Sequence, residues 1–291
     1  MTSFDVVAAV RRASGERRVG HAGTLDPAAI GVLPVCLGQA TRVIQYLTED
    51  TKTYCAEIVL GAVTDTYDAE GRVLERRDPG GITQDQVEAV LASFRGEIEQ
   101  MPPMYSAVKV GGRRLYELAR AGMEVERRPR RVQIFEIRLV DWKHPSFTVL
   151  VDCSKGTYIR SLAHDIGQQL GCGAYLNRLA RLRSGRFRLE DALTLEEMRE
   201  AFRTGRWKEV IYPPDEAILD WEAIVVGPQV ERELRHGRPI TTGAAKSQQG
   251  RCRAYSLQGR LLALLELDRV RLRWLPRSVF EIDIYEPDRS P

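Results

Sequence analysis

The chain has 291 residues, 43% hydrophobic and 29% charged, a balance typical of a globular protein with one large and one small domain. No apolar run could span a bilayer and no secretory signal pattern opens the chain, so a cytoplasmic location is expected. The five cysteines lack C-x-x-C spacing and the four histidines are dispersed, which argues against a disulfide scaffold and predicts no metal site.

The first third of the chain alternates predicted helices with loops and a strand. Ser3 can cap the first helix, and a capping box of Thr83 with Gln86 begins a helix that ends near Phe94. In chain order, the patterns predict a helix over residues 3–13, a glycine-punctuated loop over 15–31, a helix over 39–47, a strand over 54–60, a turn over 65–71 and a helix over 83–94.

The rest of the chain is richer in predicted strands. In chain order, the patterns predict a strand over 105–110, a helix over 113–121, strands over 132–142 and 147–153, a helix over 159–170, a helix from the Thr194–Glu197 capping box, a linker over 204–220 and strands over 251–257, 261–267 and 278–284. The whole predicts an α/β fold of the α+β type, in which helices flank a mixed, largely antiparallel sheet. The predicted domains are residues 1–210 and 211–291, the second a small β domain.

Basic residues gather in two segments, although the net charge of +3 is too small to indicate nucleic acid. Residues 109–131 hold eight basic and three acidic side chains, and residues 171–189 hold five arginines and no acid. Tyr105, Tyr116 and Tyr175 lie within or near them. A single patch is typical of a solvated face, but two arginine-rich patches with tyrosines favour contact with a phosphate backbone.

Several common catalytic signatures are absent from the sequence. There is no G-x-x-x-x-G-K-[ST] phosphate loop, no G-x-G-x-x-G after a strand and no G-x-S-x-G elbow. NTP hydrolysis, nicotinamide chemistry and serine hydrolysis therefore have no support. We expect any chemistry to be performed by side chains alone, without a cofactor.

Asp26 is the candidate that the sequence singles out, in a glycine- and proline-rich segment over residues 20–34. The following Pro27 biases its backbone away from helix, and such a loop can hold a carboxylate at a cleft. However, Asp-Pro commonly begins turns. On spacing alone, a turn-forming role is favoured over a catalytic one.

A resemblance to a known family changes that balance. The segment G-H-A-G-T-L-D-P-A-A-I-G-V-L-P-V-C-L-G-Q-A-T-R over residues 20–42 resembles the catalytic segment of the bacterial tRNA pseudouridine-55 synthases, the TruB family. The resemblance continues through K-T-Y at 52–54, L-G-x-x-T-D-T-x-D-A-x-G at 60–71, the motif P-P-M-Y-S-A-V-K at the start of 102–122, and C-S-K-G-T-Y-I-R-S-L at 153–162. It covers nearly the whole chain in order.

The resemblance implies isomerisation of uridine to pseudouridine at position 55 in the T-loop of transfer RNA. It implies that Asp26 is the nucleophile, that Tyr54 lies against the target uracil and takes part in proton removal from C5, and that Arg160 ion-pairs with Asp26. The reaction exchanges an N–C bond for a C–C bond within one nucleoside, so it needs no cofactor. Without the resemblance, Tyr54 would be interpreted as a core or cross-strand aromatic residue.

The resemblance also implies residues that contact RNA. His21 would fill the space that a flipped base leaves in the stack, and Tyr158 and Leu179 would line the pocket that receives the base. The further RNA-binding candidates are Lys109, Arg113, Arg114 and Arg181. A thumb-like insertion at about 102–130 would close over the RNA, and the C-terminal segment resembles a β-barrel RNA-binding domain of the PUA type.

One departure leaves an alternative open. The family has a strand and a Lys-Pro-x-Gly element just before the part that matches Met1, and this sequence lacks them. The alternative is an RNA-binding or tRNA-folding factor with weak or lost catalysis, and a guide-RNA-dependent relative is a second rival. The expected partner is the T-arm of transfer RNA, with a monomeric chain, no protein partner and no membrane. Attack by Asp26 at the sugar or at the base remains open.

Overall fold

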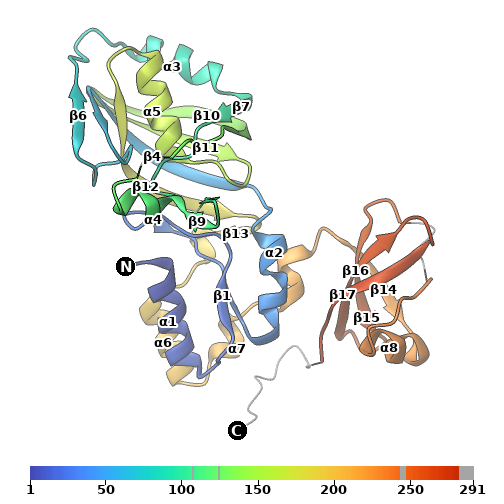
Figure 1. The fold of residues 1–291 in the computed structure, drawn as a ribbon. Coiled ribbons are helices and arrows are strands. Elements are labelled where there is room, and N and C mark those ends of the chain that lie inside the picture. The colour runs from blue at the N-terminus through green and yellow to red at the C-terminus, as the bar shows by residue number, and fades with distance from the viewer. Residues whose placement is uncertain (107, 124, 243–246, 282–291) are drawn as a thin grey trace. The chain divides into compact units, whose positions relative to one another are not determined.

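The structure is a computed structural model, which describes residues 1–106, 108–123, 125–242 and 247–281 (Figure 1). By packing, the chain divides into two compact units. The first consists of Met1–Thr24, Leu33–Thr48 and Leu193–Pro291, and the second of Leu25–Val32 and Glu49–Ala192. The short segment that contains Asp26 thus belongs to the second unit, while its flanks belong to the first.

A seven-stranded sheet organises the second unit, in the order β13-β12-β4-β11-β10-β7 with β2 beside β12. Its strands are β2 (Ile30–Gly31), β4 (Lys52–Leu60), β7 (Gly96–Gln100), β10 (Arg130–Lys143), β11 (Ser146–Cys153), β12 (Ala174–Ser184) and β13 (Phe187–Arg188). Neighbouring strands are antiparallel except for β2, which runs parallel to β12. The prediction of a mixed, largely antiparallel sheet is confirmed.

Two helices cover one face of this sheet, α3 (Gln84–Ser93) and α5 (Ile159–Gln169) (Figure 1). Alternate residues of β4 are buried beneath them because successive side chains of a strand point to opposite faces. The helices contribute apolar residues spaced three or four apart, which form one stripe on each helix. The residues that meet in this core include Ala56, Ile58, Leu60, Val87, Leu91, Ile159, Leu162 and Ile166.

The second unit also contains shorter helices and strands outside the seven-stranded sheet. A hairpin of β5 (Ala62–Thr64) and β6 (Val73–Arg76) follows β4, and the 3₁₀-helix η2 (Leu189–Asp191) follows β13. The thumb-like segment holds the strand pair β8 (Lys109–Val110) and β9 (Arg113–Arg114) and the helix α4 (Leu115–Arg120). The strand predicted over 105–110 is wrong in extent, since among its described residues only Lys109 and Val110 pair, and β9 replaces the start of the helix predicted from 113.

The part of the first unit that precedes the C-terminal sheet in the chain is mainly helical. In it, α1 (Ser3–Ser14) packs against α6 (Leu195–Arg203), and β1 (Val19–His21) pairs with β3 (Val35–Leu37). The expectation that Ser3 caps α1 is wrong: Thr2 is the N-cap, in a capping box with Asp5. The remaining elements are η1 (Gly38–Val43), α2 (Ile44–Leu47), α7 (Trp207–Val210) and η3 (Pro214–Ile218).

The C-terminal part of the first unit is a four-stranded sheet with the helix α8 (Pro228–Arg235). Its strands are β14 (Glu222–Val226), β15 (Arg251–Ser256), β16 (Leu261–Asp268) and β17 (Arg273–Val279). The strand β14 runs parallel to β15 and the other neighbours are antiparallel. In the part of the chain that the structure describes, these strands do not close, so the predicted PUA-like barrel is not confirmed.

Among the strands of five or more residues, β7, β12 and β14 were not predicted. Arginine at every second or third position hides the apolar alternation of β12. The last predicted strand, 278–284, begins five residues earlier as β17, and residues 282–291 lie outside the described ranges. Over the described residues, no helix is long and apolar enough to cross a membrane.

Candidate active site

The Asp26 carboxylate meets the Arg160 guanidinium in a two-pronged ion pair. Arg160 Nε donates to Asp26 Oδ2 at 2.8 Å and Nη2 donates to Oδ1 at 2.9 Å. The Arg160 side chain is 6% exposed, whereas that of Asp26 is 36% exposed. This geometry matches the planar fork of arginine to both oxygens and leaves the carboxylate accessible from one side.

The loop of Asp26 is also a turn. The Asp26 carbonyl accepts a hydrogen bond from the Ala29 N–H at 2.9 Å, and β2 begins at Ile30. The turn-forming interpretation of Asp-Pro therefore holds for the backbone. The Asp26 side chain does not form this turn, because its oxygens accept hydrogen bonds from Arg160 and not from the turn backbone.

Arg160 lies in the first turn of α5, where the helix dipole disfavours a cation, and five oxygens compensate. Besides Asp26, it donates to the carbonyls of Tyr105 at 3.0 Å and Thr66 at 3.4 Å. Its Nη1 also lies 3.5 Å from Asp68 Oδ2. Burial of a guanidinium is costly unless its donors are satisfied, so these contacts fix Arg160 and, through it, the carboxylate of Asp26.

Tyr54 lies on β4, on the sheet face that carries the core. Burial raises the pKa of its hydroxyl, the charge of Asp26 raises it further, and the nearby Arg181 guanidinium opposes the rise. The loop that begins at Asp26 reaches this part of the sheet, because its Gly31 pairs with Arg181, the β12 residue opposite Tyr54. A phenol with a raised pKa stays neutral at pH 7 and can donate a hydrogen bond.

The predicted pocket residues Leu179 and Tyr158 are half-buried in the same unit as Asp26. Leu179 pairs with Ala56 of β4 and packs against the core. Tyr158 is the N-cap of α5, and the Gln100 side chain holds its backbone by accepting from its N–H at 2.8 Å and donating to its carbonyl at 3.0 Å. Asp26 and Arg160 are thus in contact within the same unit that contains Leu179 and Tyr158.

The predicted RNA-binding residues are scattered more widely. Arg113 is exposed, and the side chains of Lys109 and Arg114 lie outside the described part of the structure. Arg181 is 1% exposed and therefore forms no part of an exposed basic surface. His21 ends β1 in the first unit, so its expected role in the RNA stack stays a prediction.

Sequence reasoning missed two residues of the site, Asp68 and Gln100. Asp68 lies in a segment interpreted only as a turn, yet its side chain accepts from Thr66 Oγ1 at 2.5 Å and faces Arg160. Its position inside the motif of residues 60–71 was the available signal. Among the described residues, no group of three histidine, cysteine, aspartate or glutamate side chains could hold a metal ion.

Comparison with known families agrees with this arrangement. Residues 11–159 match the family described as "TruB family pseudouridylate synthase (N terminal domain)". The chain belongs to this family. Residues 160–226 match the "tRNA pseudouridylate synthase B C-terminal domain". Members of the TruB family are RNA isomerases, and the chain is accordingly a pseudouridine synthase.

Curated relatives in the TruB family match over most of the chain. A protein of Dehalococcoides mccartyi named tRNA pseudouridine synthase B is 42% identical over 290 residues, which is 100% of this chain and 96% of that relative. One of Symbiobacterium thermophilum with the same name is 49% identical over 240 residues, 81% of this chain and 78% of the relative.

Solved structures show the same fold. The protein in a structure of an H/ACA RNP bound to a substrate RNA containing 2′-deoxyuridine aligns with a TM-score of 0.74 at 25% identity, covering 98% of this chain and 84% of that one. A Cbf5-Nop10-Gar1 complex gives a TM-score of 0.73 at 27% identity, with 97% and 81% covered.

Proposed function

We propose that this TruB-family protein isomerises uridine 55 in the T-loop of transfer RNA to pseudouridine, with Asp26 as the nucleophile. The observation that carries the proposal is the two-pronged Asp26–Arg160 pair, on a loop whose Gly31 pairs with the residue opposite Tyr54. The names of the relatives, tRNA pseudouridine synthase B, support transfer RNA as the substrate class.

The ion pair suits a nucleophilic carboxylate. A nucleophile must be anionic, and the two charge-assisted hydrogen bonds from Arg160 hold both oxygens of the carboxylate in one orientation. The reaction breaks the N1–C1′ bond, forms a C5–C1′ bond, and moves one proton from C5 while N1 gains one. Attack at C1′ of the sugar and attack at the base both require the same ionised Asp26.

The half-buried aromatic and aliphatic residues suit a flipped base. The target uracil leaves the RNA stack at a cost of roughly a few kcal/mol. Stacking on Tyr54 and contact with Leu179 and Tyr158 would offset part of this cost. Tyr54 would also take part in proton removal from C5, and His21 would fill the vacancy in the stack.

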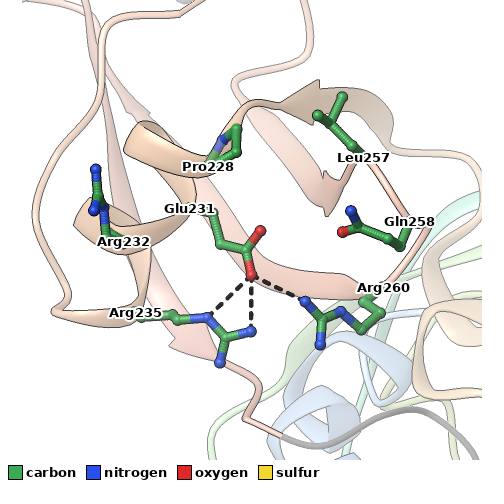
Figure 2. Close-up of a pocket in the computed structure, with 7 residues that line it drawn as sticks. All are labelled: Pro228, Glu231, Arg232, Arg235, Leu257, Gln258 and Arg260. Atoms are coloured by element: carbon green, nitrogen blue, oxygen red, sulfur yellow. Dashed lines mark hydrogen bonds and ion pairs between the residues drawn. The ribbon is translucent and has the colours of Figure 1, made fainter.

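The C-terminal sheet of the first unit would form a second RNA-binding surface, the role expected for a PUA-like domain. A pocket of about 360 Å³ opens between α8 and the turn that joins β15 to β16. Figure 2 shows its Glu231 carboxylate between two guanidinium groups, Arg235 at 2.8 Å and Arg260 at 3.3 Å. Arg232 adds a third cation to the lining, so the pocket has a net positive charge suited to phosphate.

The decisive experiment replaces Asp26 by asparagine and measures pseudouridine formation on an unmodified tRNA T-arm, without guide RNA or another protein. We expect Asp26→Asn to lower kcat at least about a thousandfold and to leave RNA affinity nearly unchanged. The matched control is Asp78→Asn. Asp78 also precedes a proline, but its exposed carboxylate only accepts from the Gly80 N–H, at 2.8 Å.

Two results would contradict the proposal. If the unmutated chain binds the T-arm but forms no pseudouridine, the protein is an RNA-binding or tRNA-folding factor. If it modifies RNA only with an added guide, it is a guide-dependent enzyme. Affinity should also weaken steeply with salt, because phosphate contacts release counterions.

A further inference from the structure

Arg181 is a buried cation that the ion pair of Asp26 does not involve. It lies on β12 directly opposite Tyr54 of β4, on the sheet face that carries the core. Its side chain ranks among the largest that are fully buried, with 1% exposure. A charge at such a place must have hydrogen-bonding partners, and the partners show what it does.

The first partner is the end of the loop that begins at Asp26. Arg181 Nε donates to the Val32 carbonyl at 2.7 Å, and the Val32 N–H donates to the Arg181 carbonyl at 2.9 Å. Gly31, which directly precedes Val32, has a φ of +107°, and a Cβ at this position would lie 2.2 Å from the Arg181 carbonyl oxygen. The end of the loop therefore contacts both the backbone and the side chain of Arg181. A residue larger than glycine would not fit at position 31.

The second neighbour is Tyr54, which lies directly opposite Arg181 on β4, where burial raises the pKa of its hydroxyl and the Arg181 guanidinium lowers it. The group is planar and carries five N–H donors in fixed directions, so its contact with the Val32 carbonyl constrains its contact with Tyr54. A lysine ammonium on a flexible stem has no such fixed geometry. One buried side chain thus joins the loop of the carboxylate to the aromatic ring.

We propose that Arg181 is a positioning residue, which sets the separation and orientation of Asp26 and Tyr54 by holding Val32 and the Tyr54 hydroxyl with one guanidinium. This role rests on the proposed function of the site. Misplacement of a reacting group by about 1 Å can cost about a hundredfold in rate, so a positioning residue affects kcat without contacting the reacting atoms.

The test compares Arg181→Met with Arg253→Met. Arg253 is a matched control in the other unit: it is 9% exposed and donates to the Leu219 and Trp221 carbonyls and to the Tyr255 hydroxyl, each at 3.0 Å. We expect Arg181→Met to lower kcat about a hundredfold at saturating RNA with little change in KM, and Arg253→Met to leave kcat near wild type. Arg181→Lys should remain at least about tenfold below wild type because it lacks the fork.

Two further measurements separate positioning from a general loss of structure. In a double-mutant cycle, Tyr54→Phe should cost much less in the Arg181→Met background than in wild type, since the two side chains act together. Hydrogen exchange at the Val32 amide should accelerate in Arg181→Met and not in Arg253→Met. Additive effects on kcat, or unchanged protection of Val32, would overturn the proposal.

Failure of this inference is distinguishable from failure of the proposed function. If the wild-type chain forms no pseudouridine, the proposed function fails. The exchange rate of the Val32 amide then decides by itself whether Arg181 holds the loop. If wild type is active and Arg181→Met keeps its kcat, the proposed function stands and the positioning role is wrong.

Discussion

The covered face of the seven-stranded sheet has two contrasting halves. At one end, Ile58 and Leu60 of β4 lie opposite Leu176 and Ala174 of β12, and Phe147 of β11 completes an apolar layer. At the other end, the register pairs polar residues, Tyr54 with Arg181 and Lys52 with Ser184. The same two strands thus build a packed core and a charged site a few residues apart.

The polar half has energetic costs that the apolar half does not have. Burial lowers the pKa of Lys52, which favours its uncharged form. In the described structure, Ser184 Oγ is buried without a hydrogen-bond partner. We infer that the apolar half supplies stability and the polar half is retained for its chemistry, a division that mutations can test.

Removing Arg160 should have the largest effect, because it acts on both catalysis and stability. Arg160→Met leaves Asp26 and Asp68 facing each other without their cation, and should destabilise the fold by about 3 kcal/mol. It should also lower kcat about a hundredfold or more, since Asp26 loses its fixed position. Urea unfolding and single-turnover kinetics measure the two effects.

The control for this prediction is Arg77→Met, which removes an exposed guanidinium paired with Glu75 at 2.8 Å. It should change stability by less than about 1 kcal/mol and leave kcat unchanged. Equal losses in both variants would mean that the Arg160 network has no special role.

Truncating the apolar half should affect stability alone. Phe147 is 1% exposed and pairs with Ile58 across the strands. Phe147→Ala should cost about 3–5 kcal/mol by removing contacts and leaving a cavity, while kcat per folded molecule stays near wild type. A kcat reduced as strongly as in Arg160→Met would show that the two halves are not separable.

The smallest predicted effect concerns pH. Burial raises the pKa of Asp165 on α5 to about 6. Because the folded chain binds this proton more tightly than the unfolded chain, the contribution of Asp165 to stability is largest below about pH 4 and is lost as pH rises through about 6, a change on the order of 1–2 kcal/mol. Asp165→Asn should remove this fall, as measured by urea unfolding between pH 4 and 7.

The exposed Asp78→Asn serves as the control for the pH prediction and should preserve the wild-type curve. A wild-type stability that rises between pH 4 and 6, with the same slope in Asp165→Asn, would show that Asp165 titrates normally. The apolar environment of α5 would then be more hydrated than its packing indicates.

Much of the fold was predictable where one face of an element is apolar. The alternation of β4, β10 and β11 and the capping boxes of α3 and α6 are local signals, and the structure confirms them. The strand β12 escaped prediction because buried arginine looks like surface arginine in sequence. Burial of Arg181 depends on Val32, which lies 149 positions away.

The site was predictable in a different way. Spacing alone favoured a turn for Asp26, and the backbone does form that turn. Its pairing with Arg160 was expected only through the family resemblance, and the structure bears it out. The contribution of Asp68 was not foreseen, since contact with Arg160 requires the hairpin of β5 and β6 to fold back toward α5.

The order in which the chain is synthesised gives the Asp26–Arg160 pair a further consequence. The two residues are 134 positions apart, so Asp26 leaves the ribosome long before its partner exists. At about 5–20 residues per second, the interval is roughly 7–27 s. Through that interval the carboxylate has neither its guanidinium nor the strand that seats its loop. A nascent chain shorter than about 181 residues therefore lacks the contacts that hold the Asp26 loop in the complete second unit.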